Sequence, residues 1–98
     1  NYLNEERFTR SYVRGKFYIK KWGRNKIKVN LLQKGISEKL IIKAYDEIDE
    51  KDYLVAIKTI LEKITPTLKG LKEYQKKQKI IKYLLSKGYE YDLIVNEI

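Results

Sequence analysis

Cysteine, histidine and methionine are all missing from this sequence of 98 residues. Without cysteine the chain forms no disulfide and offers no thiolate, and without histidine it lacks the commonest general base. The two absences together exclude zinc-finger ligation. A chain without cysteine is typical of a reducing compartment, and we expect this one to be cytoplasmic. The missing initiator methionine indicates that the sequence is a piece of a longer protein.

Glycine is scarce as well, and its five residues are too scattered to form a P-loop or a dinucleotide-binding fingerprint. No apolar run approaches the roughly 20 residues that cross a membrane, and no signal-peptide pattern opens the chain. Four carboxylates gather at Glu47, Asp49, Glu50 and Asp52, but they mark a predicted helix start, where acidic side chains are favourable anyway. We therefore predict a protein that is not an enzyme, with no catalytic residue, no metal, no cofactor and no membrane partner.

Positive charge is what the sequence has in excess. Its 22 lysines and arginines outnumber 13 acidic residues, which leaves a net charge of +9 at pH 7. Such a balance attracts nucleic acid, an acidic protein surface or an anionic membrane. A lysine-rich surface can also do no more than keep a protein in solution, and charge alone does not separate these alternatives.

The most informative segment is a helix–glycine–helix corner that occurs twice. In the first copy Gly35 suits the left-handed backbone that ends a helix, and Ser37 can accept from the free N–H groups of the next helix. In the second copy Gly88 occupies the same place. Residues 26–45 align without a gap on residues 79–98, and both the apolar register and the turn glycine coincide. Similarity of this kind predicts stacked helical repeats.

Apolar spacing over the whole chain predicts six helices and no strand, at about 5–20, 25–34, 38–48, 50–64, 71–87 and 91–98. We therefore predict an all-α fold of two tandem three-helix repeats in an elongated array, one at 1–48 and the other at 49–98. In the first helix the expected buried stripe consists of Phe8, Tyr12, Val13 and Ile19.

Two rows of cations lie on the sides of helices that are predicted to face outward. The first row contains Arg7, Arg10, Arg14 and Lys21, and the second contains Lys72, Lys76 and Lys79. A charged row is also what any amphipathic helix shows to water. Because each row carries one sign only, we predict that they form one binding surface for a polyanion.

The helix after Ser37 has the place of a recognition helix in a DNA-binding helix-turn-helix. It presents Glu38, Asp46 and Glu47 on its outward side and has no arginine for a guanine edge. Sequence-specific readout of DNA is therefore not expected, whereas contact with backbone phosphates remains open.

Five segments follow one another in the order and approximate spacing of a known family. The first reads Asn-Glu-Glu-Arg-Phe-Thr-Arg-Ser-Tyr-Val at residues 4–13, and others lie at 23–27, 32–36 and 41–44 before a closing segment at 83–94. The first resembles the signature acid-acid-x-Arg-Phe-Ala-x-x-Phe-Val of the RecX family, the regulators of the RecA recombinase. The closing segment, with Gly88 at its centre, is similar to the family's Arg-Phe-Leu-x-x-Arg-Gly-Phe-x-x-x-x-Ile.

The resemblance covers nearly the whole chain and implies the second and third of the family's three helical repeats. It also implies a non-catalytic partner of the RecA–DNA filament that inhibits recombinase and coprotease activity in DNA repair and the SOS response. The partners expected are the RecA filament and single- or double-stranded DNA through its phosphates, with the chain a monomer. The alternative is a helical domain that binds nucleic acid without specificity, and a third is a purely structural scaffold.

Overall fold

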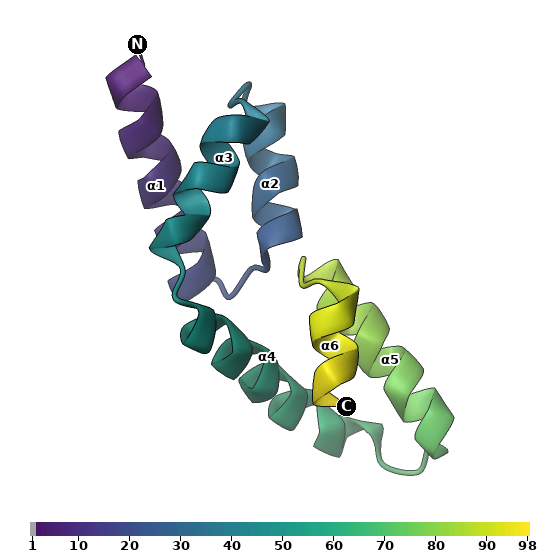
Figure 1. Ribbon diagram of the computed structural model, residues 1–98. Helices are drawn as coiled ribbons and strands as arrows, with labels where there is room; N and C mark the ends of the chain where they lie inside the picture. The colour runs from purple at the N-terminus through teal and green to yellow at the C-terminus, as the bar shows by residue number, and fades with distance from the viewer. Residues whose placement is uncertain (1) are drawn as a thin grey trace.

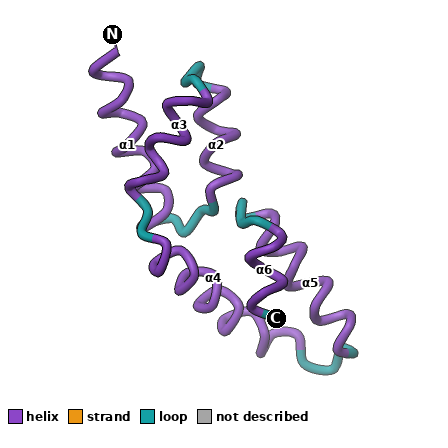
Figure 2. Tube along the Cα trace, viewed as in Figure 1, coloured by secondary structure: helices purple, strands orange, loops and turns teal. Residues whose placement is uncertain are grey.

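The computed structural model describes residues 2–98, with side chains from Asn4 onward. Within that range the chain is all helical and forms no strand, as the sequence predicts (Figure 2). The helices are α1 (Tyr2–Tyr18), α2 (Arg24–Gln33), α3 (Glu38–Ala44), α4 (Glu50–Ile64), α5 (Glu73–Ser86) and α6 (Tyr91–Glu97). Short 3₁₀ turns at Tyr45–Glu47 and Thr65–Leu68 extend α3 and α4.

The molecule is a rod of two three-helix modules, called here the first module (α1–α3) and the second module (α4–α6). Its extents are 53 × 23 × 19 Å, and its radius of gyration of 15.1 Å exceeds the roughly 13 Å of a compact chain of this length. In Figure 1, α4 leads away from the base of the first module, and the α5–α6 corner returns to the lower end of α2. None of the described helices is long and apolar enough to cross a membrane.

The two corners have the geometry that the sequence predicts. Gly35 and Gly88 have φ angles of +87° and +98°, in the left-handed region. After each glycine the chain turns back, because the N–H of Ile36 donates to Leu31 O and that of Tyr89 to Leu84 O. Ser37 caps α3 by accepting from the N–H of Leu40.

The repeat is also visible in the core. Ile27, Leu31 and Ile41 of the first module are fully buried. Their counterparts in the second module are buried as well. Those counterparts are Ile80, Leu84 and Ile94. The two triplets belong to one continuous apolar cluster that passes through Phe17, Tyr53 and Tyr89. Neither module therefore buries its apolar face alone.

The predicted stripe of α1 is wrong at two of its four positions. Phe8 is 45% exposed and Ile19 is 78% exposed, whereas Val13 is fully buried. Thr9 and Phe17 fill the core side instead, and the Thr9 hydroxyl donates to the carbonyl of Glu5. Apart from the tyrosine hydroxyls, the Thr9 hydroxyl is the one polar group among the fully buried side chains of the described residues. Because the bond to Glu5 satisfies it, a threonine can occupy this apolar position.

Candidate functional site

The junction of the two modules rests on a contact between two glycines. The N–H of Gly23, in the loop after α1, donates to Lys87 O at 2.7 Å, and the N–H of Asn25 donates to Gly88 O at 2.9 Å. A Cβ added at Gly23 would lie 2.3 Å from the carbonyl carbon of Gly88. Only a residue without a side chain allows the two backbones to approach so closely.

A polar network closes the junction around Arg24. The hydroxyl of Tyr53 accepts from the N–H of Arg24 at 3.0 Å and donates to the carboxylate of Glu90. The Arg24 guanidinium lies 4.0 Å from the Tyr53 ring centre and pairs with Glu50 at 3.1 Å and Glu90 at 3.5 Å. Burial raises the pKa of the Tyr53 phenol, and the adjacent Glu90 carboxylate raises it further. The phenol therefore keeps its proton and its role as a donor at neutral pH.

Tyr89 ties the second module to the end of α1. Its ring is fully buried at the end of a column of three rings. The centre of the Tyr53 ring lies 5.2 Å from that of Tyr89 and 5.5 Å from that of Phe17. Its hydroxyl donates to the carbonyl of Lys21 at 2.9 Å. Lys21 has a φ of +60° and is the one described residue other than glycine in the left-handed region. The junction thus holds a lysine in a backbone conformation that is unfavourable for it.

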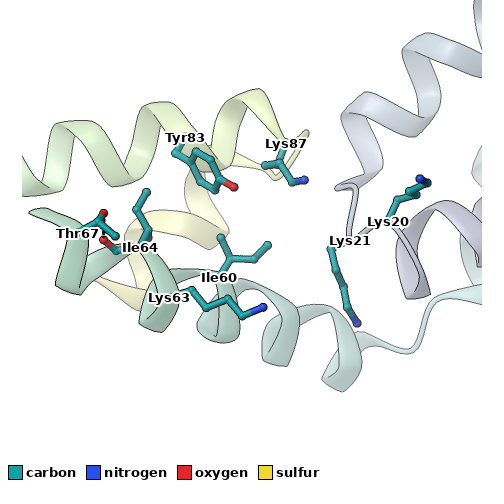
Figure 3. A pocket seen from close by; sticks show the side chains of 8 residues that line it. All are labelled: Lys20, Lys21, Ile60, Lys63, Ile64, Thr67, Tyr83 and Lys87. Carbon is teal, nitrogen blue, oxygen red and sulfur yellow. Dashed lines mark hydrogen bonds between the residues drawn. The ribbon is translucent and has the colours of Figure 1, made fainter.

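Beside this junction lies a groove of about 410 Å³, called here the lysine groove. It is lined by Lys20, Lys21, Ile60, Lys63, Ile64, Thr67, Tyr83 and Lys87 (Figure 3). Four lysines reach it from three parts of the chain: the loop after α1, the last turn of α4 and the residue that follows α5. None of the lining residues is acidic, and none of the four lysines forms an ion pair with a carboxylate in the described part of the chain. Their charges are therefore available to a bound anion.

A second hollow continues the positive surface along α5. Lys79 and Lys82 line it, and it shares Tyr83, Thr67 and Ile64 with the lysine groove. Tyr83 stands between the two hollows with 44% of its surface exposed. Two of the seven predicted cations, Lys21 and Lys79, are thus brought to one face of the molecule.

The prediction that the first basic row faces outward is wrong for Arg10. Arg14 does face outward, but its charge is already paired with a carboxylate of the protein. Both arginines bind Glu47, at 2.9 Å and 2.7 Å, and Arg10 also binds Glu6 at 3.2 Å. Only 27% of the Arg10 side chain is exposed. The hydrogen bonds from the two guanidinium groups hold the pKa of Glu47 below its usual range. These arginines join α1 to the turn after α3.

The other predicted cations are distributed less favourably. Arg7 is exposed on α1, and Lys72 is exposed at the residue before α5. The Nζ of Lys76 lies 3.7 Å from a carboxylate oxygen of Glu73 on the same helix. The structure does not gather all seven residues into one surface.

The four clustered carboxylates serve the fold. Glu47 binds two arginines, and Asp49 caps α4 by accepting from the N–H groups of Lys51 and Asp52. Glu50 pairs with Arg24, and Asp52 accepts from the hydroxyl of Tyr18 at 2.8 Å. No group of acidic residues in the described range 2–98 has the arrangement of a metal site.

Sequence reasoning missed most of the groove and all of the junction network. The missed groove residues are Lys20, Lys63, Tyr83 and Lys87, and the missed junction residues are Gly23, Arg24, Tyr53, Tyr89 and Glu90. One signal was present in the sequence: the segment Trp22–Asn25 interrupts the helical pattern, and it contains a glycine, Gly23. Nothing in the sequence indicated that this glycine faces Gly88.

Comparisons with known proteins give one consistent result. Residues 4–44 match the family model for the second three-helix domain of RecX, and residues 50–96 match the model for the third. The chain is 36% identical over 94 residues to the regulatory protein RecX of Clostridium perfringens (strain SM101), covering 94% of this chain and 43% of that protein. It is 34% identical over 94 residues to RecX of Streptococcus uberis, covering 96% and 36%.

A solved structure agrees with the sequence comparisons. The crystal structure of RecX from Lactobacillus salivarius superposes with a TM-score of 0.88 at 29% identity, over 95% of this chain and 60% of that one. The chain spans less than half the length of the curated relatives named above.

Proposed function

The chain belongs to the RecX family of regulatory proteins, and from this we propose that it binds the RecA–DNA filament and inhibits the recombinase and coprotease activities of RecA. It acts in the cytoplasm by binding alone, as a monomer, without a cofactor and without catalysis. The family models match both modules, so the proposal concerns the rod as a whole.

The observation that carries this proposal is the charge of the face around the lysine groove. A RecA–DNA filament exposes phosphates, and a partner that neutralises several of them gains affinity from the release of counterions. Four lysines that form no ion pair in the described part of the chain supply that charge at the middle of a 53 Å rod, and Asp52 is the one carboxylate in the hollow that adjoins Lys21 and Lys63. The glycine contact and the Arg24 network join the two modules, so the charges at the junction keep their positions relative to one another.

Among the seven predicted contact residues, Lys21 and Lys79 are the ones that we place against the filament. Arg7 and Lys72 are exposed and can add contacts at the two ends of the rod. Arg10 and Arg14 hold the first module together through Glu47, and Lys76 pairs with Glu73. A test of function should therefore change lysines of the groove and leave the two arginines intact.

The direct experiment measures strand exchange by RecA with increasing amounts of the purified chain, and cleavage of a RecA-dependent coprotease substrate in parallel. We expect both to be inhibited at protein levels that saturate the filament. The chain should sediment with RecA–DNA filaments at salt concentrations that release it from bare DNA. Equal retention on filaments and on bare DNA would favour the alternative of a non-specific nucleic-acid-binding domain.

A further inference from the structure

Lys21 is held in a backbone conformation that a different residue would adopt more easily. Its φ is +60°, and two hydrogen bonds fix it: its N–H donates to Phe17 O, and its carbonyl accepts from the hydroxyl of Tyr89. Glycine or asparagine populates this region at a lower cost than lysine. The result of having a lysine here is visible in Figure 3, where its side chain extends from the loop after α1 towards α4.

The walls of the groove combine charge with an apolar floor. Ile60 and Ile64 of α4 form the floor, and the ring of Tyr83 points towards them from α5 (Figure 3). Lysines stand on both sides of this floor. A nucleobase has an apolar face that stacks on an aromatic ring, and the phosphates on either side of it need cations without directional demands.

The choice of cation distinguishes a phosphate ligand from an acidic peptide. Carboxylates are recognised best by arginine, whose planar fork donates two parallel hydrogen bonds. In this chain Arg10, Arg14 and Arg24 already bind carboxylates of the protein itself, and no arginine lines the groove. The groove contains lysine alone, which binds phosphate as a point charge.

We propose that the lysine groove is a binding site for single-stranded DNA, with a base against Tyr83 and the neighbouring phosphates at Lys21, Lys63 and Lys87. A duplex keeps its bases stacked inside, so it cannot use the apolar floor and binds more weakly. The groove chemistry indicates a single-stranded nucleic acid. That this strand is DNA rests on the proposed function, in which the partner is a RecA–DNA filament. The groove itself acts on bare strands without RecA.

The experiment is a fluorescence anisotropy titration of labelled poly(dT) with the chain, in the absence of RecA and at several salt concentrations. The test variant is Lys63→Gln with Lys87→Gln, and Tyr83→Leu is tested separately. The matched control is Lys39→Gln with Lys43→Gln, which removes the same charge from a hollow that also contains Glu5 and Glu6. We expect the groove variant to lose affinity at least tenfold and its salt slope to fall by about 0.7 per lysine. The control should stay within about twofold.

Lys21→Asn provides the second measurement, because it separates binding from folding. Asparagine tolerates a positive φ, so the melting temperature should stay the same or rise while affinity for poly(dT) falls. If Lys21 were only structural, its replacement would lower stability and leave binding unchanged, and that result would overturn the assignment.

Three other results would also overturn it. These are equal losses from the groove and control pairs, no loss from Tyr83→Leu, and binding of poly-glutamate in preference to poly(dT) at the same ionic strength. The inhibition of strand exchange is measured independently. A chain that inhibits RecA but does not bind poly(dT) would refute the groove assignment and leave the proposed function standing. A chain that binds poly(dT) but does not inhibit RecA would refute the proposed function and leave the groove assignment standing.

Discussion

Three glycines of this chain allow backbone strain to be measured separately from close packing. Gly35 has a φ of +87° and nothing within 4 Å of the position of a Cβ. Gly23 has an ordinary φ of −75°, but a Cβ there would lie 2.3 to 2.4 Å from backbone atoms of Gly88 and Tyr89. Gly88 combines a φ of +98° with a Cβ position only 2.5 Å from two atoms of Lys26. Alanine at each position therefore tests strain alone, packing alone, or both.

The expected losses follow from these geometries. Gly35→Ala costs about 1 to 2 kcal/mol of backbone strain, and the stiffer unfolded chain returns about 0.4 to 1 kcal/mol, which leaves a net loss of about 1 kcal/mol or less. Gly23→Ala forces the two backbones apart, which costs about 1 to 3 kcal/mol for overpacking and about 1 kcal/mol for a displaced hydrogen bond. Gly88→Ala adds the strain to a clash of similar severity, with Lys26 and the carbonyl of Gly23, and should cost about 3 to 5 kcal/mol.

Urea denaturation followed by circular dichroism measures these differences, and thermal melting provides a check. In a domain of this size each kcal/mol lowers the melting temperature by about 4 to 8 °C, so Gly88→Ala should melt at least about 10 °C below Gly35→Ala. Equal losses at Gly35 and Gly88 would mean that the two modules are not in contact at the glycine pair. An unchanged Gly23→Ala protein would lead to the same conclusion.

Further predictions concern the ion pairs, the buried phenols and catalysis. Reversing Arg10 and Arg14 to Glu should destabilise the first module, and Glu47→Lys in the same chain should restore part of the loss; unchanged melting of the double variant would contradict this. Because the folded pKa of Glu47 lies below 4.5, the stability that it contributes is present above that pH and is lost as the pH falls, so Glu47→Gln should flatten the acid side of a stability–pH curve. Burial raises the pKa values of Tyr53 and Tyr89, so the stability of the fold is unaffected by these phenols below pH 10 and declines above it, where the unfolded chain loses their protons first; a spectrophotometric titration should find two phenols that ionise only on unfolding. The purified chain should hydrolyse neither nucleotides nor DNA, and activity that follows it through purification and disappears in Asp49→Asn would contradict this, because asparagine keeps the cap of α4.

The helices and corners could be predicted because their causes are local in sequence. A turn glycine, a serine cap and apolar residues at helical spacing act within a few residues of one another, and Gly35 and Ser37 have the predicted geometry. The repeat extended this reasoning to the second module. Alignment of residues 26–45 on 79–98 correctly paired buried positions, as Leu31 and Leu84 illustrate.

The candidate site could not be predicted because it depends on how helices cross. Lys21, Lys63 and Lys87 belong to three separate segments, and only the packing of the loop after α1 beside α4 and the end of α5 brings them to one groove. The charge of Arg10 predicts a solvent-facing side chain, but Arg10 lies three residues before Val13 and seven before Phe17, so it stands at the edge of the buried face of α1. The turn after α3 supplies Glu47 there. Periodicity describes the faces of one helix and says nothing about which neighbour covers them.

The bond between the hydroxyl of Tyr89 and the carbonyl of Lys21 joins residues 68 positions apart in the chain. Such a contact forms only after the intervening chain has been ordered, whereas the corners at Gly35 and Gly88 close over a few residues and form early. Changes at Tyr89 should therefore speed unfolding and leave the folding rate almost unchanged, whereas changes at the corners should slow folding. The contact between the modules thus sets how long the native rod persists once formed, and this lifetime determines how long the chain withstands proteolysis when it is not bound to a partner.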